Sequence, residues 1–176
     1  MLEPGRENSL LDVGTGTAAL LAEVARAPDP PETAVGVDLS ERMLARAPRL
    51  PTGWRLVEGD AVELPFPEGS FDLVTASYLL HFMDPATRSR VIAEARRVLT
   101  PGGRLGVITV APPAGRISAL LSAPIRSLAR RSEGVLAGLR PRDPTPELCA
   151  AGLRPLELRR VLIGYPSLCV VCSWGG

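Results

Sequence analysis

The chain has 176 residues, a length typical of one domain, and 45% of them are hydrophobic, which is enough for a substantial core. It contains no run of 18 or more apolar residues, and the N-terminal stretch MLEPGRENS has no apolar segment of signal-peptide length. A formal net charge of +1 creates no broad field that would attract nucleic acid. We therefore expect a soluble, cytoplasmic, single-domain protein (residues 1–176) that binds no nucleic acid and is not an integral membrane protein.

All 20 basic residues are arginine. The lack of lysine excludes a Schiff-base lysine, a Walker-type phosphate-binding lysine and the Tyr/Lys pair of some dehydrogenases. The cysteines are Cys149, Cys169 and Cys172, and a zinc ribbon would need a second C-x-x-C pair, so we expect no metal site. Residues three apart on a strand point to opposite faces, and we expect Cys169 and Cys172 to be packing residues.

Apolar runs alternate with helical patterns over the first 110 residues. We predict strands at residues 10–13, 33–37, 54–57, 71–76 and 104–110. Leu20, Leu21 and Val24 mark one face of a helix after the first strand. Ser40 can cap a helix after the second strand, which is predicted to carry Met43, Leu44 and Ala47. Near-continuous apolar strands separated by helices are typical of a parallel sheet that is covered on both faces.

The clearest helical pattern follows the fourth strand. Asp84 can serve as its N-cap, and Pro85 fits the first turn. Apolar residues then recur at helical spacing from Val91 to Leu99, and the Pro-Gly-Gly sequence at 101–103 is predicted to end the helix.

The pattern changes after Val110. Residues 111–144 are rich in Pro, Gly and Arg, and a short helix is predicted over 146–151. Strands are predicted at 156–163 and 167–174, and the connection between them, residues 164–166, is so short that we expect an antiparallel pair.

A glycine turn ends the first strand, in the stretch SLLDVGTGTAA over residues 9–19. Gly14 and Gly16 allow a close backbone approach to a ligand, and Asp38 lies 22 positions after Gly16, at the end of the second strand. This spacing suits a carboxylate that binds both hydroxyls of a ribose. Read alone, Gly14, Gly16 and Ala19 also fit the dinucleotide pattern G-x-G-x-x-G/A, so the turn does not separate a nicotinamide cofactor from S-adenosylmethionine.

Other polar residues at strand ends favour one of the two cofactors. Asp12 would lie poorly beside a pyrophosphate, whereas it suits a ligand with a positive amino group and no phosphate. Asp60 and Ala61 follow the third strand, where a side chain and a backbone amide can bind an adenine edge. Ser77 and Tyr78 follow the fourth strand and face the same crevice.

With these segments in place, the chain resembles the class I S-adenosylmethionine-dependent methyltransferases, most closely the small-molecule group that includes the ubiquinone and menaquinone enzymes. The matching motifs are LLDVGTGTA (10–18), VGVDLS (35–40), EGDAVELPFPEGSFDLV (58–74), LLHFMD (79–84) and RVLTPGGRL (97–105). The resemblance is close over residues 8–110 and looser over the C-terminal strand pair. It implies an α/β fold: a Rossmann-like three-layer α/β/α sandwich around a mostly parallel seven-stranded sheet in the order 3-2-1-4-5-7-6, with strand 7 antiparallel.

The resemblance also implies methyl transfer from S-adenosylmethionine to a small-molecule acceptor that the sequence does not identify. Gly14, Thr15 and Gly16 are then expected to pass under the methionine part of the cofactor. Asp12 is expected near its amino group, directly or through water, and Ser77 is expected to line the methionine side.

The nucleoside half of the cofactor involves the second and third strands in this family. Asp38 is expected to bind the ribose, with Leu39 and Met43 against the adenine. Asp60 is expected to accept a hydrogen bond from the adenine amino group, and Ala61 to donate one from its backbone amide.

The sequence departs from the family pattern in two places. Ala18 replaces the third glycine of the turn, which crowds the backbone mildly. Only about seven residues precede the first strand, where the family usually has helices that cap the cofactor. Either the pocket is open, or a second copy, a partner chain or another segment closes it, or the sequence is a shortened form of the protein.

No obvious catalytic signature is present, and alignment and exclusion of water can supply most of the rate of a methyl transfer. His81 and Tyr78 are weak catalytic candidates: His81 is either a base or a structural residue, and Tyr78 either lines the acceptor pocket or covers the sheet edge. Residues 111–144 are expected to form a lid or substrate insertion for an apolar or anionic acceptor, or else an amphipathic helix with solvated arginines.

Two other functions stay open at this point. The chain could be a catalytically inactive binding or scaffold protein with a methyltransferase fold, which the short N-terminus favours. A nicotinamide oxidoreductase is disfavoured by Asp12, by residues 59–61 and by the lack of a Tyr/Lys pair.

Overall fold

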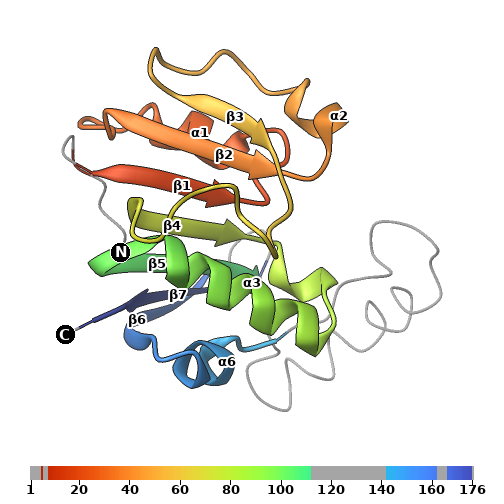
Figure 1. Ribbon diagram of the computed structural model, residues 1–176, viewed down its shortest axis with the longest axis vertical. Helices are drawn as coiled ribbons and strands as arrows, with labels where there is room; N and C mark the ends of the chain where they lie inside the picture. Colours follow the sequence, from red (N-terminus) through yellow and green to blue (C-terminus); the bar gives the residue numbers. More distant parts are fainter. Residues whose placement is uncertain (1–4, 6–7, 112–141, 162–165, 176) are drawn as a thin grey trace.

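A single sheet organises the computed structural model, which describes residue 5 and residues 8–111, 142–161 and 166–175. The sheet has seven strands in the order β3-β2-β1-β4-β5-β7-β6. β7 pairs antiparallel with both β5 and β6, and the other strand pairs are parallel. The predicted sheet order and strand directions are therefore confirmed (Figure 1). The strands are β1 (Ser9–Val13), β2 (Thr33–Asp38), β3 (Arg55–Glu58), β4 (Phe71–Ser77), β5 (Leu99–Val110), β6 (Arg154–Val161) and β7 (Ser167–Ser173).

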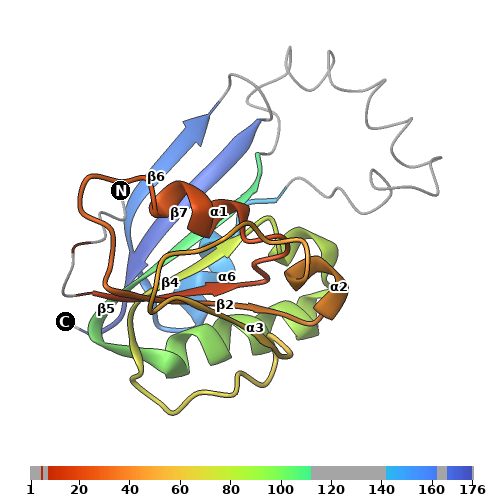
Figure 2. The same ribbon diagram turned by 90° about the horizontal axis from the view of Figure 1, so that it is seen from above.

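Helices cover both faces of the sheet, which gives the predicted three layers. Figure 2 shows α1 on one side of the sheet and α3 on the other. The helices are α1 (Ala19–Val24), α2 (Glu41–Leu44), α3 (Pro85–Val98), α6 (Thr145–Ala150) and a short 3-10 helix, η1 (Leu80–Phe82). None of these described helices has both the length and the apolar character needed to cross a membrane.

The alternation of side chains along the strands divides the core in two. Leu11 and Val13 of β1 pack into the larger core, which also contains Val91 and Ile92 of α3. Leu10, which points to the other face, packs with a smaller group that includes Leu21 of α1 and Leu73 of β4. Both faces of β1 are thus buried, as expected for a central strand of a parallel sheet.

The end of α3 differs from the prediction. Asp84 caps the helix as expected, since its side chain accepts hydrogen bonds from two backbone amides of the first turn. The helix ends at Val98, however, and residues 101–103 lie inside β5 rather than forming the stop. Gly102 donates to the Trp174 carbonyl (2.7 Å), and Trp174 donates to the Gly103 carbonyl (3.1 Å). Pairing with Trp174, just after β7, therefore holds the Pro-Gly-Gly sequence inside β5, where Gly102 has a φ angle of +83°.

Smaller differences concern element ends. Met43 and Leu44 are in α2 as predicted, but Ala47 lies beyond its end. β6 begins two residues before the predicted start, at Arg154. The expected lid is described only at its two ends, because residues 112–141 lie outside the described part of the chain, and so do residues 162–165 of the predicted hairpin.

Cys169 and Cys172 behave as packing residues, whereas Cys149 is exposed. Cys149, Cys169 and Cys172 carry free thiols. Cys172 is buried in the larger core, whereas Cys169 lines a small hollow of about 160 Å³ together with α1 residues such as Leu20. The two side chains thus point to opposite faces, as predicted, and burial raises the pKa of the Cys172 thiol to about 11.

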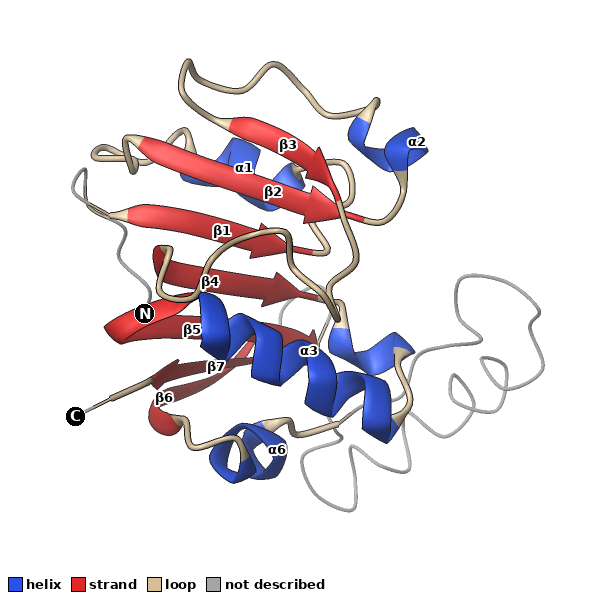
Figure 3. Cartoon of the chain, in the orientation of Figure 1, coloured by secondary structure: helices blue, strands red, loops and turns tan. Residues whose placement is uncertain are grey.

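An ion pair fastens α6 to α3. The Arg88 side chain is 3% exposed, and its Nε and Nη2 atoms donate to the Glu147 carboxylate at 3.0 and 2.8 Å. Its Nη1 atom donates to the Met83 carbonyl at 2.6 Å. Because the guanidinium is buried, the carboxylate compensates a charge that water cannot reach. The pair therefore holds α6 against α3, two helices that lie on the same side of the sheet in Figure 3, and the Met83 bond adds the residue that ends η1.

Glu147→Gln is expected to lower the free energy of unfolding by about 2–4 kcal/mol, because it leaves the buried Arg88 charge uncompensated. Chemical denaturation measures this change. The matched control is Glu23→Gln, which breaks the exposed Glu23–Arg26 pair and is expected to cost less than about 0.5 kcal/mol. Similar losses in the two variants would contradict the assigned role of the buried pair.

Candidate functional site

The carboxyl ends of the parallel strands share one edge of the sheet, to which the arrowheads of β1, β2, β3 and β4 point in Figure 1. Four large apolar side chains are exposed close to this edge: Leu39 (68%), Met43 (38%), Tyr78 (37%) and Phe82 (58%). Exposed apolar side chains that gather at one place are typical of a ligand site. In open α/β sheets this edge is also where ligands bind.

The glycine turn follows β1 at this edge. The amides of Gly14 and Thr15 both donate to the Val37 carbonyl, at 2.8 and 2.9 Å, so the turn is fixed to the end of β2. Gly14 and Gly16 have φ angles of +69° and +58°, a region that glycine adopts without strain. A Cβ atom on Gly16 would meet only the Met43 Cε atom, at 3.5 Å, so the turn leaves room for a ligand.

Ala18 stands where the family has its third glycine. Its side chain is fully buried, and its φ angle is +57°. This left-handed backbone conformation costs an alanine about 1 kcal/mol. The turn keeps the conformation that a glycine would give.

Asp38 links the turn to the second strand. Its Oδ2 atom accepts from the Gly16 amide at 2.7 Å, and its Oδ1 atom accepts from the Ser40 amide at 2.9 Å. The second bond forms the start of α2, where the Ser40 side chain accepts from the Met43 amide. Each carboxylate oxygen has a further lone pair, so Asp38 can hold the turn and still accept hydrogen bonds from a ribose.

Asp12 lies beneath the turn and is 1% exposed. Thr15 donates to its Oδ2 atom and Thr75 of β4 donates to its Oδ1 atom, each at 2.7 Å. Burial raises the pKa of Asp12 to about 6, against the lowering effect of the two hydroxyls, and the nearby charge of Asp38 adds to the rise. Because this pKa is close to neutral pH, a small change in the surroundings of Asp12 alters the fraction of the carboxyl that is ionised.

The remaining predicted cofactor residues also lie at this edge. Asp60 is exposed just after β3, and its Oδ1 atom accepts from the Val62 amide at 3.0 Å. Ala61 follows it, and Ser77 is the last residue of β4. The structure thus places the predicted cofactor residues at four strand ends along one edge of the sheet, and the contact assigned to each stays a prediction.

Tyr78 and His81 lie beyond β4. Tyr78 has a φ angle of +53°, unusual for a tyrosine, and its hydroxyl hydrogen-bonds to the Ser167 hydroxyl of β7. His81 is 4% exposed in η1, its Nδ1 atom has no hydrogen-bond partner among the described residues, and burial lowers its pKa. The two rings meet edge-on with centroids 6.2 Å apart. Strained backbone and an unpaired buried nitrogen are features that cluster at functional sites.

Three site residues were missed by the sequence reasoning. Thr75 pairs with Asp12, Phe82 packs against the His81 ring with centroids 4.0 Å apart, and Ser167 holds Tyr78. Phe82 could have been found, because it is an apolar residue of the LLHF motif just after a strand. Ser167 could not, since it is 89 positions from Tyr78 and no local pattern joins them.

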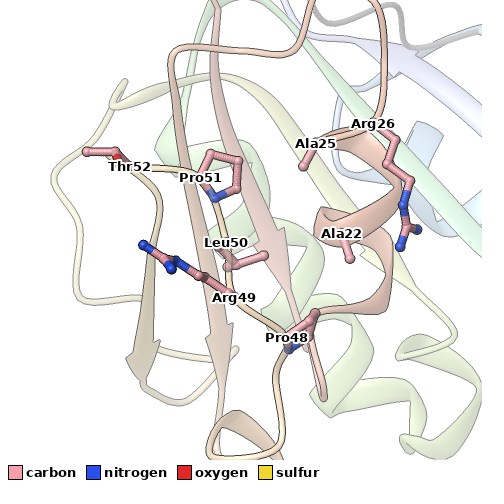
Figure 4. A pocket seen from close by; sticks show the side chains of 8 residues that line it. All are labelled: Ala22, Ala25, Arg26, Pro48, Arg49, Leu50, Pro51 and Thr52. Carbon is pink, nitrogen blue, oxygen red and sulfur yellow. The ribbon is translucent and has the colours of Figure 1, made fainter.

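A separate hollow of about 400 Å³ lies between α1 and residues 48–52. Figure 4 shows that it is open between Ala22 and Ala25 on the helix and Leu50 and Pro51 on the loop. None of the predicted cofactor residues lines it. The candidate site is therefore defined by the strand ends and not by this hollow.

Comparisons with known proteins agree with this geometry. A family model described as "Methyltransferase domain" matches residues 10–103, more than half of the chain. A demethylmenaquinone methyltransferase of Deinococcus radiodurans is 35% identical over 171 residues, which cover 85% of this chain and 67% of that protein. A demethylmenaquinone methyltransferase of Thermus thermophilus is 40% identical over 108 residues, which cover 59% of this chain. The chain spans about half (48%) of the length of this relative.

Solved structures support the fold. A SAM-dependent methyltransferase from Methanosarcina mazei superposes with a TM-score of 0.70 at 20% identity, covering 97% of this chain and 93% of that one. The [4+2]-cyclase SpnF superposes with a TM-score of 0.74 at 21% identity, covering 99% of this chain and 76% of that one. At such identities the likeness concerns the fold, which does not fix the chemistry. The family model and the more similar relatives identify the family. The chain belongs to the class I S-adenosylmethionine-dependent methyltransferases, in the group that includes the ubiquinone and menaquinone enzymes.

Proposed function

We propose that the chain binds S-adenosylmethionine across the carboxyl edge of its sheet and transfers the methyl group to a small-molecule acceptor. The observation that carries this proposal is the open glycine turn held between β1 and β2 by the Asp38 carboxylate. The cofactor supplies an activated methyl group on a positively charged sulfur. The residues of the chain bind it, orient it and keep water away.

The geometry fits the cofactor in its two halves. The methionine part of the cofactor lies against the backbone of Gly14, Thr15 and Gly16 in this proposal. Ser77, the last residue of β4, lies beside it. Asp12, below the turn, places a negative charge near the ammonium group.

The nucleoside half then lies over β2 and β3. Asp38 accepts from the ribose hydroxyls, and the exposed Leu39 and Met43 side chains pack against the adenine. Asp60 accepts from the adenine amino group, and Ala61 donates its backbone amide. These two apolar side chains are exposed in the free protein and become buried when the adenine binds against them.

The acceptor is proposed to lie on the β4 side of the turn. The Leu79 side chain packs directly over Gly14. A Cβ atom added to this glycine would lie only 2.7 Å from the Leu79 Cδ1 atom, so the two residues are in close contact. Tyr78, His81 and Phe82 flank this contact and present hydrogen-bonding and aromatic groups. A neutral His81 can accept a proton from an acceptor that must lose one, whereas Tyr78 can orient it.

Asp38→Ala is expected to weaken the binding of S-adenosylhomocysteine between several-fold and a hundredfold, about 1–3 kcal/mol for lost buried polar contacts. The change removes the ribose acceptor and also frees the Gly16 amide. Isothermal titration calorimetry of the full chain measures it, and NAD is expected not to bind. The control is Glu41→Gln at the exposed start of α2, where affinity should stay the same. Unchanged affinity in Asp38→Ala would mean that the ribose lies elsewhere.

Activity is tested by transfer of a labelled methyl group from S-adenosylmethionine to a panel of acceptors. A demethylated menaquinone is the first to try, because two relatives are named for it. We expect S-adenosylhomocysteine to form only when an acceptor is present. Cofactor binding with no turnover on any acceptor would favour a binding or scaffold protein instead.

Closure of the site by a second copy or a partner chain also stays a proposal. Sedimentation of the full chain with S-adenosylhomocysteine tests it. A monomer whose bound ligand is fully enclosed would contradict it.

A further inference from the structure

A buried carboxyl lies directly below the place proposed for the ligand's ammonium group. Asp12 precedes Gly14 by two residues, and its Oδ2 atom accepts from Thr15, the residue between the two glycines of the turn. Its other oxygen accepts from Thr75 of β4. A ligand bound against Gly14 and Gly16 would thus lie next to Thr15, whose hydroxyl donates directly to this carboxyl.

We propose that binding of the adenosyl cofactor expels the proton that Asp12 carries at mildly acidic pH, so that the affinity for the cofactor depends on pH. This inference rests on the proposed function. In the step, the O–H bond of the neutral carboxyl breaks, the proton passes to the solvent buffer, and the carboxylate pairs with the ammonium. No bond of the ligand changes.

The surroundings of Asp12 favour this exchange. Water is excluded, and the carboxyl receives hydrogen bonds from two neutral hydroxyls rather than from a cation. The charged group that acts on it is Asp38 at the end of β2, whose sign opposes ionisation. Of the other acids on adjacent elements, Asp72 accepts from Ser9 and Glu23 pairs with Arg26. An arriving ammonium would therefore be the first positive charge near Asp12 among the described residues.

The direction of the pH effect follows from the free protein. The pKa of Asp12 is about 6 before binding, and a nearby ammonium lowers it. Below that pH the carboxyl must lose its proton for the ligand to bind, which weakens affinity. Affinity is therefore expected to rise as the pH is raised from 5 to 7 and to level off above.

The experiment is calorimetric titration of the full chain with S-adenosylhomocysteine, in pairs of buffers that differ in ionisation enthalpy. At pH 5.5 we expect release of roughly half a proton or more, and at pH 7.5 almost none. The association constant is expected to increase about five- to tenfold between pH 5 and 7. The control ligand is 5′-methylthioadenosine, which has the same nucleoside but no ammonium group, and it should release no proton.

Two variants assign the proton to its residue. Asp12→Asn is expected to bind with an affinity independent of pH over this range. Thr75→Val removes a hydrogen bond that lowers the pKa of Asp12, so the rise in affinity should move to higher pH. Asp72→Asn, at the far end of β4, is the matched control and should keep the original profile.

Proton uptake, or no release at any pH, would overturn the inference. So would an equal release with 5′-methylthioadenosine, which would point to Asp38 and the ribose, or an unchanged profile in Asp12→Asn, which would point to His81. Failure of both ligands to bind at every pH would instead overturn the proposed function, and this inference with it.

Discussion

The site depends on how the first two strands are joined at their carboxyl ends. The Val37 carbonyl accepts from two amides of the glycine turn, and the Asp38 carboxylate accepts from a third. One side chain thus fixes the turn, starts α2 through Ser40 and still has lone pairs for a ligand. Without this junction the backbone of the turn would lack partners, and the open space above Gly16 would have no defined shape.

The parallel sheet explains why the remaining groups meet there. Its strands end at one edge, so residues far apart in sequence, such as Asp60 and Ser77, lie along one line. Ion pairing of Arg88 with Glu147 holds the helices beyond β4 in place, and with them the segment that carries His81. Large apolar side chains are exposed along this edge, a feature that ligand-binding surfaces share.

Much of this arrangement could be predicted from the sequence, because it rests on local patterns. Apolar runs predicted the strands, and Asp84 followed by Pro85 predicted the start of α3. The role predicted for residues 101–103 was wrong, because they belong to β5, where Gly102 pairs with Trp174, a contact between distant parts of the chain. The bond between Tyr78 and Ser167 was missed for the same reason, as was the hydroxyl of Thr75, which reaches Asp12 from β4. Contacts between strands depend on register, which composition and spacing do not reveal.

Backbone amide chemical shifts can map where S-adenosylhomocysteine binds on the full chain. We expect the largest changes at Gly14, Gly16, Asp38 and Ala61, along the carboxyl edge. Changes confined instead to residues around Ala22, Ala25 and Leu50, in the hollow between α1 and the loop at 48–52, would contradict it. Such a result would separate the glycine turn from the ligand and leave its geometry without the role assigned to it.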